Sequence, residues 1–170
     1  VKEASFIGEV GLDISSKGTN NIELQKKIFE SIVNECAKVG NKIISIHSRK
    51  TDDIIFDFLK RSSCIYIMHW YTGNIKRLLN AMSSDDNIYV SINSDMVHSY
   101  NSRKLIEAVP LSRMVLETDA PFTAKTKNEY PKQILNDIVI EIAKIKKIER
   151  LQVLKTISDN SRKILSIQER

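Results

Sequence analysis

Short apolar segments alternate along the chain with segments in which apolar side chains recur at helical spacing. The first pattern is typical of buried strands and the second of amphipathic helices. We predict strands over 6–12, 42–47, 64–69, 88–92 and 114–117, and helices over 22–39, 52–61, 74–82, 102–108 and from Pro131 onward. Near-continuous apolar strands separated by helices indicate an α/β fold with a parallel sheet, either an open doubly wound sheet or a barrel.

The composition is that of an ordinary globular protein, with 170 residues, 42% of them hydrophobic and 28% charged. One domain is the default for this length. There is no secretory leader and no apolar run long enough to span a bilayer, so we expect a cytoplasmic protein without a membrane partner. Cys36 and Cys64 lack metal-type spacing and are predicted to be buried, reduced thiols.

The net charge of +5 and the pI near 9.1 permit attraction to polyphosphates. Much of that charge is lysine scattered among apolar residues, and the KIKKIER run at 144–150 is read as a solvated helix face. Charge alone therefore does not identify the substrate.

Polar side chains stand at the carboxyl ends of the predicted strands, where parallel α/β folds place their functional groups. These residues are Glu9, His47, His69, Asn93 and Asp119. Taken singly, each histidine is explained as a core residue and the aspartate as a cap. Together, imidazole and carboxylate donors at equivalent positions predict a divalent metal site, since these groups suit zinc, manganese or iron.

Other hydrolytic and cofactor chemistries lack their sequence signatures. The chain contains no G-x-S-x-G elbow, no Walker loop and no glycine-rich dinucleotide motif. His98 follows a loop-like segment and is predicted to be a surface residue. Metal-dependent hydrolysis is the chemistry that remains.

Four ordered motifs resemble those of a known family: IGEVGLD at 7–13, IHSR at 46–49, MHWYTG at 68–73 and LETDAPF at 116–122. They are similar to successive motifs of the TatD family, metal-dependent nucleases of the amidohydrolase superfamily with a TIM-barrel fold. The resemblance implies that Glu9 bridges two divalent cations, Mg, Mn or Zn, and that His47 and His69 are ligands. It also implies that Asp119 binds metal or handles the proton of the attacking water, and that Asp13 orients a ligand or a basic side chain.

The sequence departs from this family at several points. Trp70 and Tyr71 stand where a Cys-Phe pair is usual, and Tyr130 interrupts the segment before Pro131. The family's HxHxD motif on strand one is absent from these residues. Because GExGLD lies on strand four in the family, and ETDAP on strand eight, we expect residues 1–170 to be the C-terminal portion of a single TatD-like barrel domain. Strands four to eight of an incomplete (β/α)8 barrel are expected to show little nuclease activity alone.

The implied reaction is hydrolysis of nucleic-acid phosphodiester bonds, on DNA rather than RNA, as an exonuclease. Arg49 would hold a phosphate or form a structural salt bridge, and Asn128, next to Lys127, is a weaker substrate contact. Trp70 or Tyr71 would stack on a terminal base or pack in the core. Two alternatives stay open: hydrolysis of another ester such as misacylated tRNA, and a TatD-like subunit with protein partners in a bacterial anti-phage assembly.

Overall fold

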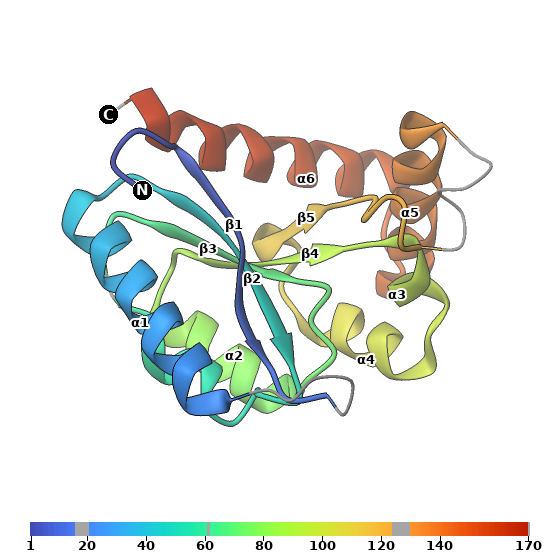
Figure 1. The fold of residues 1–170 in the computed structure, drawn as a ribbon. Helices are drawn as coiled ribbons and strands as arrows, with labels where there is room; N and C mark the ends of the chain where they lie inside the picture. The colour runs from blue at the N-terminus through green and yellow to red at the C-terminus, as the bar shows by residue number, and fades with distance from the viewer. Residues whose placement is uncertain (16–20, 61, 124–129, 170) are drawn as a thin grey trace. The chain divides into compact units, whose positions relative to one another are not determined.

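The computed structural model describes residues 1–15, 21–60, 62–123 and 130–169 as an α/β structure (Figure 1). The strands are β1 Phe6–Asp13, β2 Ile43–Arg49, β3 Ile65–His69, β4 Ile88–Ile92 and β5 Met114–Leu116. The α-helices are α1 Ile22–Val39, α2 Ile75–Ser84, α3 Ser94–His98, α4 Tyr100–Ala108, α5 Pro131–Lys146 and α6 Arg150–Leu165. Short 3-10 helices cover η1 Ile55–Phe58, η2 Leu111–Arg113 and η4 Ser166–Glu169. None of the described helices is both long and apolar enough to cross a bilayer.

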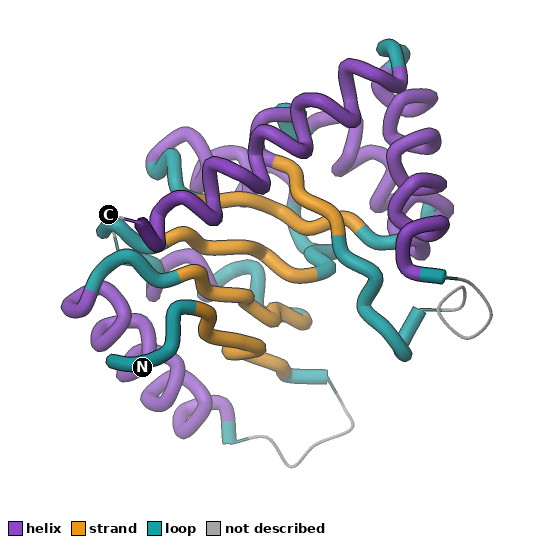
Figure 2. The backbone as a smooth tube through the Cα atoms, turned by 90° about the horizontal axis from the view of Figure 1, so that it is seen from above, coloured by secondary structure: helices purple, strands orange, loops and turns teal. Residues whose placement is uncertain are grey.

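The strands follow the order β1-β2-β3-β4-β5 in one five-stranded sheet. The pairs β1 with β2, β2 with β3 and β4 with β5 are parallel, which confirms the predicted parallel α/β fold. Figure 2 draws the strands in orange and the helices in purple. The chain forms two compact units, one comprising Val1–Tyr89 with Ile164–Arg170 and the other Val90–Lys163. The strands β1 to β3 belong to the first unit, and β5 belongs to the second.

The strand β1 approaches β2 so closely that two of its positions have no room for a side chain. A Cβ on Gly8 would lie 2.7 Å from Cβ of Ser45, and one on Gly11 would lie 1.8 Å from the carbonyl oxygen of His47. The register of β1 against β2 shifts between Ile7 and Val10, a stretch that contains Gly8 and Glu9. Such a bulge changes the direction in which a side chain points, and here that side chain is Glu9.

The helix α1 follows from its sequence pattern. The side chain of Asn21 accepts a hydrogen bond from the backbone N–H of Leu24 (3.1 Å) and so caps the first turn. One face buries Phe29, Val33 and Cys36. Cys36 and Cys64 are buried and unpaired, as predicted, and Sγ of Cys64 donates to the carbonyl oxygen of Cys36 (3.2 Å). Burial raises the pKa of the Cys36 thiol.

Two predictions of secondary structure are wrong in detail. The helix expected over 52–61 is the short η1, because the Asp52 carboxylate accepts from the backbone N–H of Asn74 (3.1 Å) and Leu59 is extended. The loop expected before His98 is instead α3, since the side chain of Asn93 accepts from two backbone N–H groups of its first turn. His98 ends α3 and is exposed, so its predicted surface position is confirmed.

Candidate metal centre

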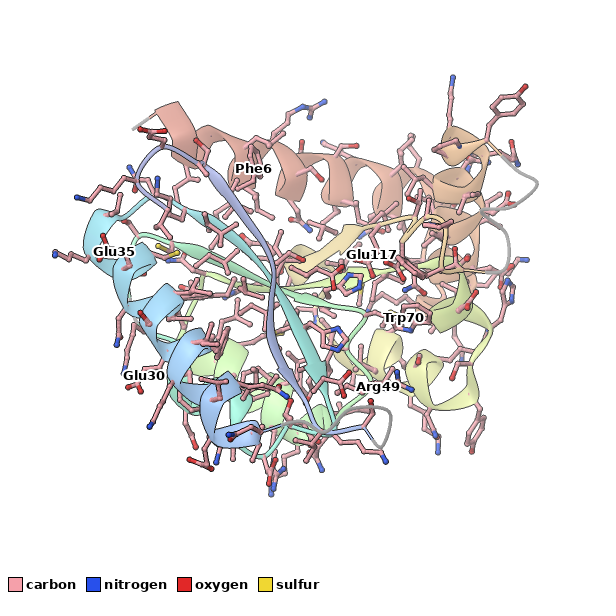
Figure 3. All side chains as sticks on the ribbon, viewed as in Figure 1. Phe6, Glu30, Glu35, Arg49, Trp70 and Glu117 are labelled. Atoms are coloured by element: carbon pink, nitrogen blue, oxygen red, sulfur yellow. The ribbon has the colours of Figure 1, made fainter. Side chains whose placement is uncertain are left out.

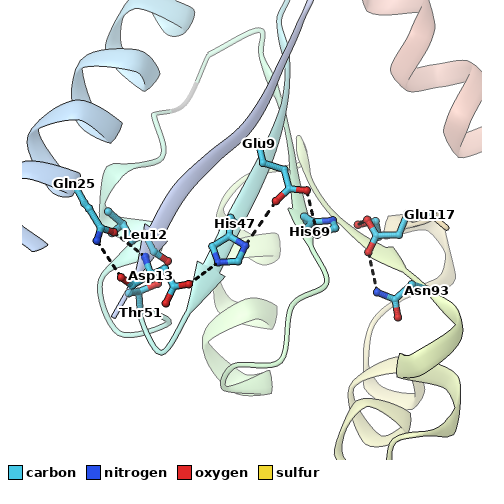
Figure 4. A network of polar contacts seen from close by, with 10 residues as sticks. Glu9, Leu12, Asp13, Gln25, His47, Thr51, His69, Asn93 and Glu117 are labelled. Atoms are coloured by element: carbon cyan, nitrogen blue, oxygen red, sulfur yellow. Dashed lines mark hydrogen bonds and ion pairs between the residues drawn. The ribbon is translucent and has the colours of Figure 1, made fainter. Parts of the chain in front are cut away.

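The carboxylate of Glu9 lies between two imidazole rings. Its Oε1 is 3.3 Å from Nε2 of His69, and its Oε2 is 3.7 Å from Nδ1 of His47 (Figure 4). The bulge in β1 supplies Glu9, while His47 and His69 face each other across the register of β2 and β3. The first unit therefore brings together three of the predicted site residues.

The other ring nitrogen of His47 faces Asp13. Nε2 of His47 lies 3.3 Å from Oδ2 of Asp13, while Oδ1 of Asp13 accepts from the backbone N–H of Ser15 (2.7 Å). Burial would raise the pKa of Asp13, but the hydrogen bonds from Ser15 and His47 outweigh it and lower the pKa. An ionised carboxylate can only accept, so the contact with Asp13 favours the His47 tautomer with its proton on Nε2, while Nδ1 is directed toward Glu9.

Side chains from two sides hold the end of β1 in place. Thr51, which is fully buried, donates through Oγ1 to the carbonyl oxygen of Leu12 (3.1 Å). The side-chain amide of Gln25 bonds to both backbone polar groups of Asp13. Sequence reasoning missed Gln25 and Thr51. A signal for Gln25 was present, because it lies four residues before buried Phe29 and hence on the buried face of α1.

The predicted substrate contacts of the first unit differ in exposure. Arg49 is exposed at the end of β2, and Trp70 follows His69 directly with a left-handed backbone (φ 37°) (Figure 3). Tyr71 is fully buried, its hydroxyl donates to the carbonyl oxygen of Asn74 (3.1 Å), and its ring packs against Phe56. Burial raises the pKa of Tyr71. For Tyr71, this position favours core packing, one of the two alternatives left open by the sequence.

Asp119 belongs to the second unit and follows β5. Its backbone is left-handed (φ 50°), and its carbonyl oxygen accepts from the backbone N–H of Phe122 (2.7 Å). The buried hydroxyl of Thr123 donates to the carbonyl oxygen of Thr118 (2.8 Å) and closes the same turn. Lys127 and Asn128, the weaker substrate candidates, lie outside the described residues.

In the second unit, the carboxylate of Glu117 is held by hydrogen bonds from two side chains. Its carboxylate accepts from the hydroxyl of Ser91 and from Nδ2 of Asn93 (3.2 Å), both of which are buried. Asn93 was expected at the strand-end cluster, and within the second unit it caps α3 and bonds Glu117. Sequence reasoning missed the roles of Glu117 and Ser91, because these partners are 26 residues apart.

A sequence model of the TatD-related DNase family matches residues 1–166. The chain belongs to the TatD-related DNase family. It is 33% identical over 162 residues to an uncharacterized metal-dependent hydrolase of Methanocaldococcus jannaschii, covering 94% of this chain and 61% of that protein. It is 24% identical over 178 residues to a human protein named as a 3′-5′ RNA nuclease, covering 97% of this chain and 23% of that protein. The chain thus spans less than two thirds of the length of these relatives.

The fold is shared with solved TatD structures. The crystal structure of a TatD family hydrolase from Entamoeba histolytica superposes with a TM-score of 0.79 at 19% identity, covering 96% of this chain and 64% of that one. The α/β architecture of this TatD chain is therefore that of the TIM-barrel hydrolases.

The donor atoms of the first unit suit a divalent cation. Glu9 offers two carboxylate oxygens, and His47 and His69 each direct a ring nitrogen toward them. With Nε2 of His47 in contact with Asp13, Nδ1 is the nitrogen suited to bind metal. A mixed set of oxygen and imidazole nitrogen ligands is typical of hydrolytic zinc and manganese sites.

Proposed function

We propose that the protein carrying this TatD chain is a metal-dependent hydrolase that cleaves nucleic-acid phosphodiester bonds. The observation that carries the proposal is the position of the Glu9 carboxylate between Nδ1 of His47 and Nε2 of His69. A carboxylate with an imidazole on each side is suited to share a cation with both rings. The family description as DNases, and the nuclease name of the human relative, support the choice of substrate class.

Glu9, His47 and His69 would hold the cation, and we propose Asp119 as a further ligand. A bound divalent cation supplies Lewis acidity toward a phosphoryl oxygen and makes water more acidic. Asp119 is proposed as a ligand because it follows a parallel strand, and the carboxyl ends of parallel strands share one edge of a sheet. Zinc, manganese and magnesium are the candidates, and we propose that the site would hold two ions, with Glu9 among the ligands.

We further assign Asp119 the proton of the attacking water. Its carboxylate is a suitable base, and two hydrogen bonds fix the turn that carries it: Phe122 N–H to the Asp119 carbonyl, and Thr123 Oγ1 to the Thr118 carbonyl. A base held in a fixed position accepts a proton without first paying the entropy of ordering its loop. This role does not depend on whether Asp119 also contacts metal.

Arg49 and Trp70 are proposed as the substrate contacts. Arg49 is exposed at the end of β2, the strand that bears His47, and a guanidinium can bind a phosphate through two hydrogen bonds. Trp70 follows His69 directly and is half-buried, and we propose that its indole stacks on a base beside the metal ligands. Stacking on a terminal base would favour exonuclease action on single-stranded DNA. We place the protein in the cytoplasm, in line with its two unpaired, buried thiols.

The test uses the purified full-length protein with end-labelled single-stranded DNA and RNA of one sequence. We expect stepwise shortening of DNA with added Mg²⁺, Mn²⁺ or Zn²⁺, loss of activity with EDTA, and loss in Glu9→Gln. The exposed Glu30→Gln is the matched control. Cleavage that is indifferent to EDTA would overturn the proposal. Hydrolysis of an aminoacyl ester with no cleavage of either oligonucleotide would replace it with the other ester chemistry.

A further inference from the structure

At Asp13, the backbone groups on the outer edge of β1 form hydrogen bonds with a side chain. β1 is first in the strand order, and β2 is its partner among the described strands. Neighbouring residues of a parallel strand direct their backbone polar groups to opposite sides. On the β2 side, the carbonyl oxygen of Leu12 accepts from Thr51 and the N–H of Ile14 donates to the carbonyl oxygen of Arg49 (3.1 Å). The backbone groups of Asp13 therefore point away from β2.

The side chain of Gln25 bonds to both of these groups. The backbone N–H of Asp13 donates to Oε1 of Gln25 (2.8 Å), and Nε2 of Gln25 donates to the carbonyl oxygen of Asp13 (3.0 Å) (Figure 4). The primary amide presents a carbonyl acceptor and an N–H donor side by side, so it takes the place of a neighbouring strand. Gln25 is itself fixed, because it lies in the first turn of α1, which Asn21 caps.

As a result, each polar group of Asp13 has a partner. Gln25 holds its N–H and carbonyl, the backbone of Ser15 holds Oδ1, and Nε2 of His47 holds Oδ2. The position of the carboxylate relative to His47 is then determined by the backbone of Asp13, and that backbone is held by Gln25. A chain of hydrogen bonds runs from α1 to the ring of a candidate metal ligand.

We propose that Gln25 is a positioning residue, which fixes Asp13 so that His47 keeps its proton on Nε2 and presents an unprotonated Nδ1 to the cation. This inference rests on the proposed metal centre for its purpose, but its geometry lies within the first unit. Without Gln25, the carboxylate would sample other positions and the imidazole would exchange between its two neutral tautomers. A ring with its proton on Nδ1 has no lone pair there to offer a metal.

A purely structural role of Gln25 makes a different prediction. If the amide only satisfies two backbone groups, its loss would lower stability and leave the His47 tautomer of the folded protein unchanged. The tautomer is therefore the property that separates the two roles.

The experiment compares full-length wild type with Gln25→Leu and Gln25→Glu. Leucine keeps the approximate volume but removes both hydrogen bonds, whereas glutamate keeps the acceptor and loses the donor. Asn34→Leu is the matched control, because Asn34 is an exposed amide on the same helix. The tautomer is measured on metal-free protein from the ¹⁵N shifts of His47, above the titration range of histidine, with His47→Gln to assign the signals. These shifts report on the folded population, and Zn²⁺ affinity is measured separately by competition with a chelator.

We expect His47 to be protonated on Nε2 in wild type and in Asn34→Leu, and to show mixed tautomers in Gln25→Leu. Zn²⁺ affinity should fall by about 10- to 100-fold in Gln25→Leu, with a smaller loss in Gln25→Glu. An unchanged tautomer in Gln25→Leu, an unchanged Zn²⁺ affinity, or an equal loss in Asn34→Leu would each overturn the inference. If wild type binds no metal, the proposed function fails, and the tautomer comparison still decides whether Gln25 positions His47.

Discussion

Nε2 of His47 lies 3.3 Å from Oδ2 of Asp13, while Nδ1 of the same ring faces Glu9. The two carboxylates thus stand at opposite nitrogens of one imidazole. Asp13→Ala should lower the affinity of the full-length protein for Zn²⁺ by about 10- to 100-fold, because the ring loses the acceptor that orients it. The Zn²⁺ affinity of Asp13→Asn should lie between those of wild type and Asp13→Ala, since its amide oxygen still accepts from Nε2 of His47. Isothermal titration calorimetry measures both affinities, with the exposed Asp53→Ala as the control. A Zn²⁺ affinity of Asp13→Ala equal to that of wild type would show that Asp13 does not orient His47.

Asp119→Asn should reduce oligonucleotide hydrolysis by about 10²-fold or more while the protein stays folded. The substitution keeps the size of the side chain but removes its charge and its basicity. Turnover is measured on labelled DNA, and circular dichroism verifies folding. The exposed Asp159→Asn serves as control. Wild-type turnover in Asp119→Asn would exclude this carboxylate from the reaction.

Trp70→Ala should raise KM for single-stranded DNA by roughly tenfold and change kcat much less. Stacking of one base on an aromatic ring contributes about 1–3 kcal/mol, and about 1.4 kcal/mol corresponds to tenfold. Tyr100→Ala removes an exposed ring from α4 and is the matched control. An unchanged KM in Trp70→Ala would show that the indole does not bind the substrate.

Gly11→Ala should destabilise the protein by about 1–3 kcal/mol or more, because the added Cβ would lie 1.8 Å from the carbonyl oxygen of His47. To relieve that overlap, β1 and β2 would have to separate at His47, which is a candidate metal ligand. Urea unfolding measures the loss, and the exposed Ser31→Ala on α1 gives the background effect of a surface alanine. A stability equal to wild type would contradict the close approach of the two strands.

Glu141→Gln should destabilise the protein near neutral pH by about 0.5 kcal/mol, with the difference disappearing in acid. The hydrogen bond from Lys144 (2.6 Å), aided by the positive charges nearby, outweighs burial and lowers the pKa of Glu141 from its ordinary 4.5. A carboxyl with a lowered folded pKa stabilises the fold above its unfolded pKa, and this contribution is lost as the pH falls through the folded value. The free energy of unfolding, measured from neutral pH down into acid, checks this prediction, with Glu30→Gln as control. A stability difference between wild type and Glu141→Gln that grows in acid would contradict it.

Local periodicity was enough to predict the strands, the parallel sheet and α1. The apolar spacing of α1 survives in its buried residues Phe29 and Val33, because a surface helix must turn one face to the core. Periodicity failed where side chains form hydrogen bonds with the backbone. Asn93 starts α3 by accepting from two backbone N–H groups. Asp52 accepts from the distant backbone N–H of Asn74 instead of from its own turn. Capping of this kind depends on which groups the fold brings close.

The motifs also singled out Glu9, His47 and His69, whose carboxylate and imidazole groups lie together in the structure. The grouping of Asp119 with them, and the assignment to barrel strands four to eight, stay predictions from the family pattern. The hydrogen bonds between Gln25 and the backbone of Asp13 could not be predicted from the order of residues alone.

What the sequence by itself determined is therefore the strands, most of the helices and the kinds of donor atom at the strand ends. The tertiary structure decided which nitrogen of His47 meets Asp13 and which meets Glu9. Those choices depend on the bulge between Ile7 and Val10, on the contact of Gly11 with β2 and on the position of Gln25. The physical reason is range: periodicity reflects neighbours within a turn or a pleat, whereas a hydrogen bond between Asp13 and His47, 34 residues apart, exists only after both strands have packed in register.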